Sequence, residues 1–458
     1  MGNRGPRLNR FGGTGNPPSF DRPTLIRRRG LPVDVPRSPA RPRLRKSIFD
    51  PVHGPIHFDP EMLALLGNAV VQRLWGVRQT GFAHLVFPGA NHTRLEHSLG
   101  AYWTARGMAE AIDLPAEERP VVAAAGLLHD IGHPPFSHTL DGPLAEAFGT
   151  THEGIGRALV LGRAGPGVPA DPRLREELER AGISPTAVAD LIDPPVRTER
   201  RPLLRQLLHG AIDADRIDYL QRDAHYTGVA HGFIDAARLL ATIDQERGRL
   251  VFASKGRSAI EGFLVGRALM YASVYYHKTV RAAETMAQAA VERSADFESR
   301  THAWVRATDG ELLTRLQEEG GLPGELVRGL IERRLYKRIY SGPGPTDPGE
   351  AGALARGPDR RALEDRWADR AGAPHGSVLI DPAALLEHRR GHPEWAEVAL
   401  RVDDRIEYPF RRSPLARFWG DREPSVAGVA VYAHRQWRDR LHRRGPAWSR
   451  QGRPRANG

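Results

Sequence analysis

Five segments of the chain carry apolar residues at spacings of three and four, and this helical period limits the fold more than any other feature of the sequence. The segments span residues 60–71, 98–112, 117–130, 203–211 and 259–295. Apolar residues at these spacings line one face of a helix, and that face must be buried against other elements. We therefore predict a mainly α protein.

Short stretches that alternate like β-strands are added to the helices, most of them toward the C-terminus. They are residues 47–49, 54–58, 249–253, 378–380, 398–402, 405–408 and 429–432. A smaller α+β region should therefore follow the helical core.

Composition indicates where the domains end within the 458 residues. Gly, Pro and Arg dominate residues 1–45, so we predict a disordered basic segment there. The main helical domain would span residues 46–340. Residues 341–375 begin with Ser-Gly-Pro-Gly-Pro and are interpreted as a linker or mobile insertion. The α+β region would span residues 376–440, and residues 441–458 would form a basic disordered tail.

The net charge of +11 is concentrated at the two ends of the chain. Residues 1–50 and 411–458 each hold 12 Lys or Arg against 3 Asp or Glu, so the residues between them carry a net charge of −7. Basic ends with Trp419, Trp437 and Trp448 are compatible with weak nucleic-acid binding through charge and base stacking. A nucleic-acid-binding or nucleotide-sensing protein with a structural metal is therefore one interpretation of the chain.

The sequence contains no cysteine, which excludes disulfides, thiolate metal sites and cysteine nucleophiles. Any metal must then be held by His, Asp or Glu. No apolar stretch approaches the ~20 residues of a membrane-spanning helix. The N-terminal residues also lack the apolar core of a signal peptide. We expect a cytoplasmic protein that does not bind membranes.

The segment that begins at His129 contains three histidines and two aspartates within thirteen residues. The apolar residues 121–128 before it predict a buried helix whose last turn carries His129 and Asp130 into the interior. A buried carboxylate needs a partner, and a divalent cation shared with a neutral imidazole would be one. His97 and Asp215 adjoin helical segments and would complete a set of two His and two Asp ligands, with positions open for water or substrate. Mn, Fe, Mg, Co, Ni and Zn all tolerate such ligands.

Together these segments resemble the HD-domain phosphohydrolases, which are named for the adjacent His-Asp pair. The similarity is greatest to their deoxynucleoside triphosphate triphosphohydrolase branch, and it covers about residues 46–340. A bare His-Asp pair is a weak signal, but several ordered segments that include Gly-His-Pro-Pro-Phe-Ser-His are specific. The matching stretches are residues 49–54, 78–80, 87–90, 93–100, 129–141, 152–153 and 213–225, with Tyr275, His277 and Lys278. The resemblance implies a helical bundle core that contains an HD domain.

The resemblance also implies roles for the residues that match the family's motifs. The metal ligands would be His97, His129, Asp130 and Asp215. The catalytic residues would be His133, His138, Asp141 and His152. Among the latter, His138 would protonate the departing 5′ oxygen and Asp141 would orient a neighbouring imidazole.

Further matching residues would bind the substrate. Contacts to triphosphate and sugar would come from Arg94, Arg216, Tyr219, Asp223, Arg267, Tyr275 and Lys278, whereas Gln79 and Thr80 would inspect the deoxyribose. Arginines suit bidentate phosphate contacts. Two positions depart from the better-known members: Arg216 stands where a lysine is usual, and Thr80 replaces a larger apolar residue.

The sequence thus predicts a metal-dependent enzyme that hydrolyses dNTPs at the α-phosphorus, releasing a deoxynucleoside and inorganic triphosphate. Two alternatives within the superfamily are a 5′-nucleotidase and a guanosine tetraphosphate hydrolase. Hydrolysis of cyclic dinucleotides is disfavoured because that branch carries Gly-Tyr-Pro beside its histidines and this chain does not. Family members assemble as dimers and tetramers, so we expect a homo-oligomer.

Overall fold

Helices make up most of the structure, as the period of the apolar residues predicts. The computed structural model describes residues 46–165, 167–194, 202–299, 303–382, 394–403, 405–412 and 428–450. The predictions of disorder for residues 1–45 and of a role for Trp419 lie outside these ranges. Among the described residues, every helix is too short or too polar to cross a lipid bilayer.

The described chain begins with the antiparallel hairpin of β1 (Lys46–Asp50) and β2 (Gly54–Phe58), as predicted. The single helix expected over residues 60–71 is instead two short helices, α1 (Pro60–Leu66) and α2 (Ala69–Gln72). The break occurs because the side chain of Asn68 accepts a hydrogen bond from the Val70 backbone N–H and caps a new helix there.

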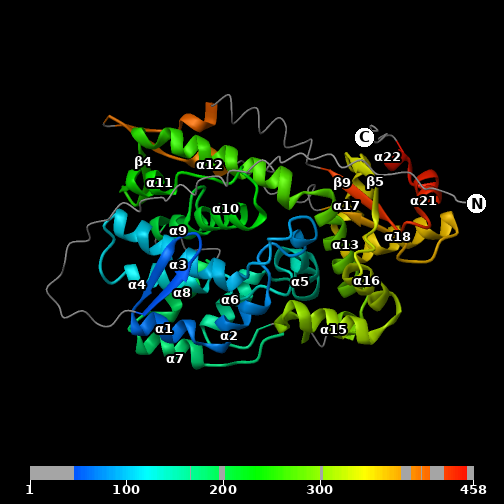
Figure 1. Ribbon diagram of the computed structural model, residues 1–458, viewed down its shortest axis with the longest axis horizontal. Helices are drawn as coiled ribbons and strands as arrows, with labels where there is room; N and C mark the ends of the chain where they lie inside the picture. Colours follow the sequence, from blue (N-terminus) through cyan, green and yellow to red (C-terminus); the bar gives the residue numbers. More distant parts are fainter. Residues whose placement is uncertain are drawn as a thin grey trace, which may run out of the picture. The chain divides into compact units, whose positions relative to one another are not determined.

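Three helices form the centre of the main core: α3 (Arg94–Ala111), α4 (Arg119–Leu128) and α10 (Ala214–Thr227). Both α4 and α10 pack against α3, as Figure 1 shows in cyan and green. Every residue from 121 to 128 is buried, as predicted. Helix α3 passes close to Gly126, where an added Cβ would lie 2.9 Å from the Ala101 carbonyl oxygen. The close packing of these helices brings together the segments that carry the predicted metal ligands.

Further helices complete this core. They are α5 (Asp141–Phe148), α6 (His152–Val160), α7 (Arg173–Arg180), α8 (Pro185–Ile192), α9 (Pro202–His209), α11 (Ala236–Thr242), α14 (Ala295–Ser299), α15 (Asp309–Glu319) and α16 (Gly321–Ile331). Short 3₁₀ turns are η1 (Arg73–Gly76), η2 (Ala83–Leu85), η3 (Ser137–Leu140), η4 (Ser254–Gly256), η6 (Ala303–Arg306), η7 (Glu394–Glu397) and η8 (Pro409–Arg412).

The prediction of one long helix over residues 259–295 is wrong. Helix α12 (Arg257–Met270) passes into a π-helical turn, η5 (Tyr271–Tyr275), and α13 (Lys278–Glu292) starts anew. The side chain of His277 accepts a hydrogen bond from the Thr279 backbone N–H and caps α13. The π-turn widens the helix where its tyrosines face the candidate site described below.

Two small sheets contain the other strands. The predicted strand at residues 249–253 is β4 (Arg249–Ala253). Its sheet has the strand order β3-β4-β7-β8. The other three strands are β3 (Ile243–Glu246), β7 (Leu400–Val402) and β8 (Arg405–Glu407). The other sheet has the order β5-β9-β6, from Lys337–Gly342, Val429–Ala433 and Val378–Asp381. These sheets confirm the α+β character of the C-terminal part.

The interpretation of residues 341–375 as a linker or mobile insertion is wrong. They hold α17 (Pro348–Ala355) and α18 (Gly357–Ala371), which pack with β5, β6 and β9 around a second hydrophobic core, drawn in yellow to red in Figure 1. The apolar residues Leu354, Leu363 and Trp367 are buried in it. The sequence did not predict these helices because Gly, Pro and charged residues are frequent in them. In α18, few apolar residues mark the face that is buried.

The described part of the predicted tail is also ordered. Helices α21 (Arg438–Arg444) and α22 (Ala447–Arg450) place Leu441 and Trp448 in the second core. The ring of Trp448 contacts Trp367 edge-on at a centroid distance of 6.2 Å. Trp448 is therefore not available for base stacking, and residues 451–458 lie outside the described ranges.

Candidate metal centre and active site

The four predicted metal ligands converge between α3, α4 and α10. His97 Nε2 lies 3.2 Å from His129 Nε2 and 3.0 Å from Asp215 Oδ1. Asp130 Oδ1 lies 3.3 Å from His129 Nε2. His97 comes from α3, His129 and Asp130 follow α4, and Asp215 stands in the first turn of α10.

The donor atoms of this group fit a divalent cation. His97 Nδ1 lies 2.7 Å from Asp218 Oδ2, and His129 Nδ1 lies 2.9 Å from the Gly126 carbonyl oxygen. Because both acceptors hold a proton on Nδ1, the Nε2 atoms, which face each other and the carboxylates, are the atoms that can bind a cation. Two imidazole nitrogens and two carboxylates in this arrangement could hold a cation and still leave positions open.

Charged groups around the centre set its protonation. Burial opposes ionisation of Asp130, but Arg94 and the neighbouring histidines outweigh it and hold the pKa of Asp130 well below its usual value. Burial also disfavours protonated His97, yet Asp215 and Asp218 raise the pKa of His97 to about 10. In the absence of a cation the group thus retains a proton, and a metal ion must displace it.

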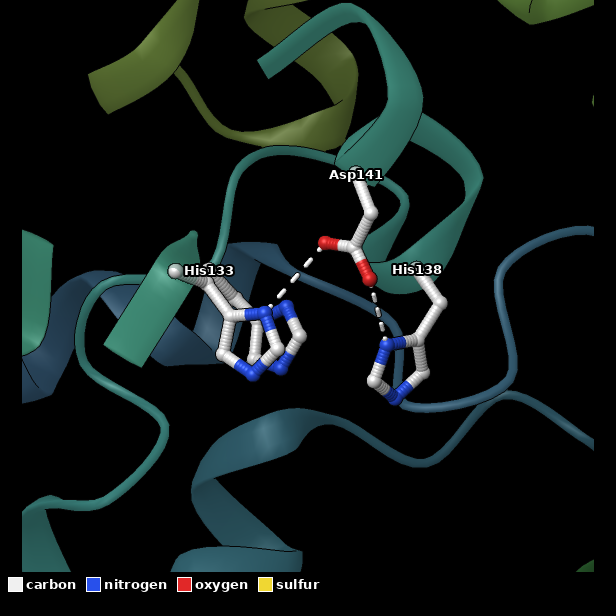
Figure 2. A group of neighbouring side chains, drawn as sticks. His133, His138 and Asp141 are labelled. Atoms are coloured by element: carbon white, nitrogen blue, oxygen red, sulfur yellow. Dashed lines mark hydrogen bonds and ion pairs between the residues drawn. The ribbon is translucent and has the colours of Figure 1, made fainter. Parts of the chain in front are cut away.

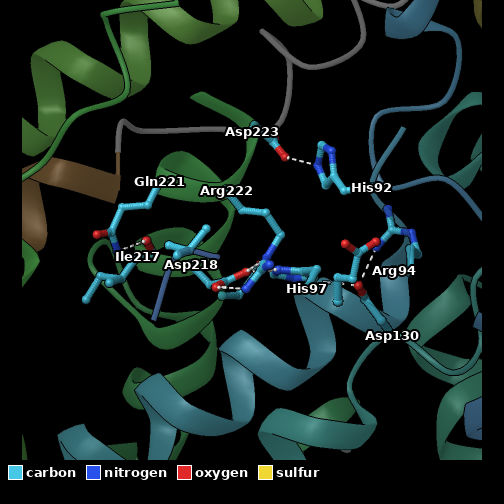
Figure 3. Close-up of polar contacts among 12 residues, drawn as sticks. His92, Arg94, His97, Asp130, Ile217, Asp218, Gln221, Arg222 and Asp223 are labelled. Atoms are coloured by element: carbon cyan, nitrogen blue, oxygen red, sulfur yellow. Dashed lines mark hydrogen bonds and ion pairs between the residues drawn. The ribbon is translucent and has the colours of Figure 1, made fainter. Parts of the chain in front are cut away.

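Asp218 belongs to a buried network that the sequence reasoning missed (Figure 3). Its carboxylate accepts hydrogen bonds from Arg222 Nε and Nη2, both at 2.9 Å, as well as contacting His97. Arg222 Nη1 donates to Asp50 Oδ2 at 2.8 Å, and His53 Nε2 lies 2.5 Å from Asp218 Oδ1. The hairpin β1–β2 is thereby tied to the helix that carries Asp215. These four residues lie in the segments that match the family's motifs, residues 49–54 and 213–225. Their spacing in the sequence does not indicate that they contact one another.

The four predicted catalytic residues form a second group beside the metal centre (Figure 2). Asp141 accepts from two histidines: Oδ2 lies 2.9 Å from His138 Nδ1, and Oδ1 lies 3.3 Å from His152 Nδ1. The ring of His133 stacks on that of His152 at 3.6 Å with an interplanar angle of 19°. His133 Nε2 lies 3.3 Å from Asp130 Oδ1, so the second group adjoins the metal ligands.

The protonation states differ within this second group. Burial opposes ionisation of Asp141, but His152 and His138 outweigh it and hold the pKa of Asp141 well below its usual value. Burial likewise opposes protonation of His152, whereas Asp141 raises its pKa. Burial, Arg94 and His152 keep the pKa of His133 well below its usual value. The second group thus combines an ionised carboxylate with histidines of different basicity, His152 and His133, which suits acid–base chemistry.

Stacking argues against a second metal ion held by this group. The lone pairs of an imidazole lie in the plane of its ring, and nearly parallel rings at 3.6 Å direct them side by side and not toward one point. In the first group the rings of His97 and His129 meet at 82°, and their Nε2 atoms face each other. The two groups therefore differ in chemistry, although both are rich in histidine.

A buried aspartate from α15 holds the segments that border the second group. Asp309 Oδ1 accepts from the Phe136 backbone N–H at 2.7 Å, and Oδ2 accepts from the Arg78 backbone N–H at 3.0 Å. Phe136 and Ser137 have φ angles of 57° and 58°, a left-handed conformation that non-glycine residues seldom adopt. Asp309 therefore stabilises the turn that leads into His138, and the sequence offered no signal for it.

Two adjoining cavities surround these groups, and Gln79, His138 and Tyr219 line both. Three of the four predicted metal ligands, His129, Asp130 and Asp215, line the polar cavity together with Arg94 and Arg216. The aromatic cavity is lined by residues that include Phe136, Tyr219, Tyr271, Tyr275 and Tyr276. A ligand with a charged end and a flat apolar end would fit across the junction.

The predicted substrate contacts divide between these cavities. Arg94 and Arg216 line the polar cavity, Thr80, Asp223 and Tyr275 line the aromatic cavity, and Gln79 and Tyr219 line both. Two predicted contacts are not brought to either cavity. The guanidinium of Arg267 lies over the Tyr271 ring at 4.9 Å, and Lys278 is exposed at the start of α13.

Arg94 contacts both a metal ligand and the turn that leads into His138. Nη1 donates to Asp130 Oδ2 at 2.5 Å and Nε donates to Ser137 Oγ at 2.6 Å, whereas Nη2 is buried without a hydrogen-bond partner among the described residues. A phosphate oxygen could accept from Nη2. The polar cavity also contains Arg205 and His209 from α9, which the sequence reasoning missed. The sequence predicts a helix at α9, but it does not show that the face with Arg205 and His209 is directed toward the metal ligands.

Comparisons with known proteins indicate the family of the chain. The family model described as the HD domain matches residues 94–223, and the one described as the HD associated region matches residues 234–445. The uncharacterized protein YwfO of Bacillus subtilis is 31% identical over 65% of this chain and 72% of its own length. An uncharacterized protein of Methanocaldococcus jannaschii is 38% identical over 54% of this chain, which spans only 49% of that protein.

A named enzyme and solved structures are also similar. Deoxynucleoside triphosphate triphosphohydrolase SAMHD1 of Homo sapiens is 30% identical over 55% of this chain and 45% of its own length. The crystal structure of a phosphohydrolase from Bacteroides thetaiotaomicron has a TM-score of 0.64 and 25% identity, and covers 85% of this chain and 100% of its own. A hypothetical protein from Aquifex aeolicus gives a TM-score of 0.66 at 26% identity, over 88% of this chain and 100% of its own. The chain therefore belongs to the HD-domain phosphohydrolases that carry an HD associated region.

Proposed function

We propose that the chain is a metal-dependent dNTP triphosphohydrolase, which attacks dNTPs at the α-phosphorus and releases a deoxynucleoside and inorganic triphosphate. One observation carries the proposal: His138 lies at the junction of a polar cavity with the metal ligands and an aromatic cavity. An acid at that junction would stand where the bond between the phosphate and the nucleoside breaks.

The residues of the polar cavity would bind the triphosphate. A divalent cation would be held by His97, His129, Asp130 and Asp215, and it supplies Lewis-acid polarisation of the phosphate when bound. Arg94 would donate from Nη2 to a phosphate oxygen, and Arg216 lines the same cavity. Together they offset the negative charge of the substrate next to Asp130 and Asp215.

His138 would supply the proton for the leaving group. Asp141 accepts from His138 Nδ1, so Nε2 can carry a second proton toward the 5′ oxygen of the nucleoside. The hydrogen bond to Asp141 also fixes the orientation of the His138 ring. His152 shares the same carboxylate and would hold a proton within the group.

The aromatic cavity would bind the nucleoside. Its tyrosines offer flat surfaces for a base, and Tyr275 donates to Asp223 Oδ2 at 2.5 Å. The pair would bind a sugar hydroxyl. Similarity to SAMHD1, which is named a deoxynucleoside triphosphate triphosphohydrolase and is 30% identical over 55% of the chain, supports a dNTP as the substrate.

Substitution of His138 tests the proposed acid. His138→Ala should keep its metal, since His138 is not among the four ligands, and should lose turnover with dNTPs by about 100-fold or more. Metal content and triphosphate release are measured on the same preparation. Loss of the metal in this variant would contradict the proposed role, and release of phosphate or pyrophosphate by the wild type would indicate a different HD phosphohydrolase.

A further inference from the structure

The aromatic cavity is lined by residues whose buried polar atoms find no partner within the described part of the chain. Gln79 Oε1, Thr80 Oγ1 and Thr139 Oγ1 have no hydrogen-bond partner among the described residues, and all three residues line the aromatic cavity. Buried polar atoms in folded proteins are nearly always paired with protein, water or ligand. Three in one cavity therefore indicate a polar group of a ligand.

A carboxylate faces the same place. Glu284 also lines the aromatic cavity, and its Oε2 accepts from Arg281 Nη1 at 2.5 Å. A Cβ atom on Gly81 would lie 3.2 Å from Thr139 Oγ1 and 3.6 Å from Glu284 Oε1. This hydroxyl and this carboxylate oxygen therefore both lie next to the backbone of Gly81.

The position of these atoms indicates which part of a nucleotide they would meet. Thr80 follows Gln79 and Thr139 follows His138, and both Gln79 and His138 line the two cavities. Thr80 and Thr139 are therefore chain neighbours of residues at the junction, where the group bonded to the phosphate would be. In a nucleotide that group is the sugar, and the base would lie farther along the aromatic cavity.

We propose that Thr80, Thr139 and Glu284 bind the 2′-hydroxyl of a ribose, so that the site accepts ribonucleoside triphosphates as well as dNTPs. A hydroxyl group both donates and accepts, which matches a carboxylate and two unpaired threonine hydroxyls among the residues that line one cavity. A deoxyribose has no group to offer them, and Asp223 with Tyr275 is available for the 3′-hydroxyl of either sugar. The orientation of the nucleotide rests on the proposed function.

Binding of non-hydrolysable nucleotides tests the inference without turnover. The full chain loaded with Mn²⁺ is titrated with analogues of ATP and dATP in which a methylene group replaces the bridging 5′ oxygen, so that the bond to the α-phosphorus cannot be hydrolysed, and the ratio of the two Kd values is measured. The wild type should bind the ribonucleotide about tenfold more tightly, the effect of one to two hydrogen bonds. Thr139→Val keeps the shape of the side chain without the hydroxyl and should reduce this preference by about tenfold.

A matched variant and a second substitution complete the experiment. Thr242→Val removes a buried hydroxyl outside the cavities and should leave the Kd ratio unchanged. Tighter binding of the deoxyribonucleotide by the wild type, or an unchanged ratio in folded Thr139→Val, overturns the inference. If Thr139→Val does not fold, Thr80→Val gives the same comparison. Triphosphate release from dATP is measured separately, so that failure of the proposed function is distinguished from failure of the ribose inference.

Discussion

At the scale of single residues, the metal centre depends on the atoms that orient its imidazoles. His97 faces the other ligands with Nε2 because Asp218 Oδ2 lies 2.7 Å from its Nδ1. Motif and helix pattern were sufficient to single out His97, His129, Asp130 and Asp215 in the sequence. They could not single out Asp218 as their support, because the contact depends on how α10 packs on α3, 121 residues apart in the chain.

Asp218→Asn should weaken metal binding. The substitution removes the charge that fixes the proton on His97 Nδ1, and the loss of such an outer partner typically costs about 10- to 100-fold in affinity. Isothermal titration with Mn²⁺ measures the change after circular dichroism has shown that the variant is folded.

Asp190→Asn is the matched control for this prediction. Asp190 also pairs with an arginine, Arg157, at 2.7 Å, but its side chain is 41% exposed and touches no metal ligand. Its affinity for Mn²⁺ should equal that of the wild type. An unchanged affinity in Asp218→Asn would show that His97 is oriented without this carboxylate.

At the scale of elements, α15 stabilises the active site although it contributes no residue to either group of histidines. Asp309 at the start of α15 holds the backbone at Arg78 and Phe136, next to Gln79 and close to His138. A sequence cannot reveal this link, since the two hydrogen bonds span 231 and 173 residues. The elements themselves were easier to predict where apolar residues repeat, as in α3 and α4, than in α18, where charged residues predominate.

Asp309→Asn should lower turnover while leaving the metal ligands intact. One of its two acceptor oxygens becomes an amide that cannot accept, so either Arg78 or Phe136 loses its hydrogen bond and the left-handed turn relaxes. We expect kcat to fall by about tenfold with Mn²⁺ affinity unchanged. The exposed Asp113, substituted by Asn, serves as the control. Equal losses of kcat and of metal binding would indicate general destabilisation instead of a positioning role.

The contact between α18, α13 and β6 should make stability depend on pH. Burial raises the pKa of Glu364 from 4.5 to about 7, although Arg360 and the hydrogen bond from the Ile380 backbone N–H oppose the rise. The folded protein therefore binds more protons than the unfolded chain between these pH values. The free energy of unfolding should fall by about 2–3 kcal/mol as the pH rises from 4.5 to 7.

Glu364→Gln tests this pH dependence. Its amide stays neutral at every pH and can still accept from the Ile380 backbone N–H, so the contribution of Glu364 to the pH dependence should disappear. Urea unfolding at pH 5 and pH 8 measures the free energy for both proteins. The same pH dependence in both would mean that Glu364 ionises in the folded protein as readily as in the unfolded chain.

At the scale of the whole molecule, assembly stays a prediction. We propose a homo-oligomer, a dimer or tetramer, and light scattering after gel filtration should then give about two or four times the chain mass of 50.6 kDa. A mass of one chain at micromolar concentration would contradict it.

The domain boundary expected at residue 340 falls within β5, which pairs with β9 beyond it. The Gly and Pro residues after residue 340 suggested a linker, but the chain on both sides of that boundary contributes strands to one sheet. Amino-acid composition does not reveal such pairing between distant strands.

Identification of the product tests the central claim most directly. The purified full chain is analysed for its bound metal and incubated with each of the four dNTPs, with and without a second nucleotide as activator. We expect a divalent metal near one per chain and release of inorganic triphosphate with the matching deoxynucleoside. Metal-loaded protein that releases no triphosphate from any dNTP under either condition would contradict it.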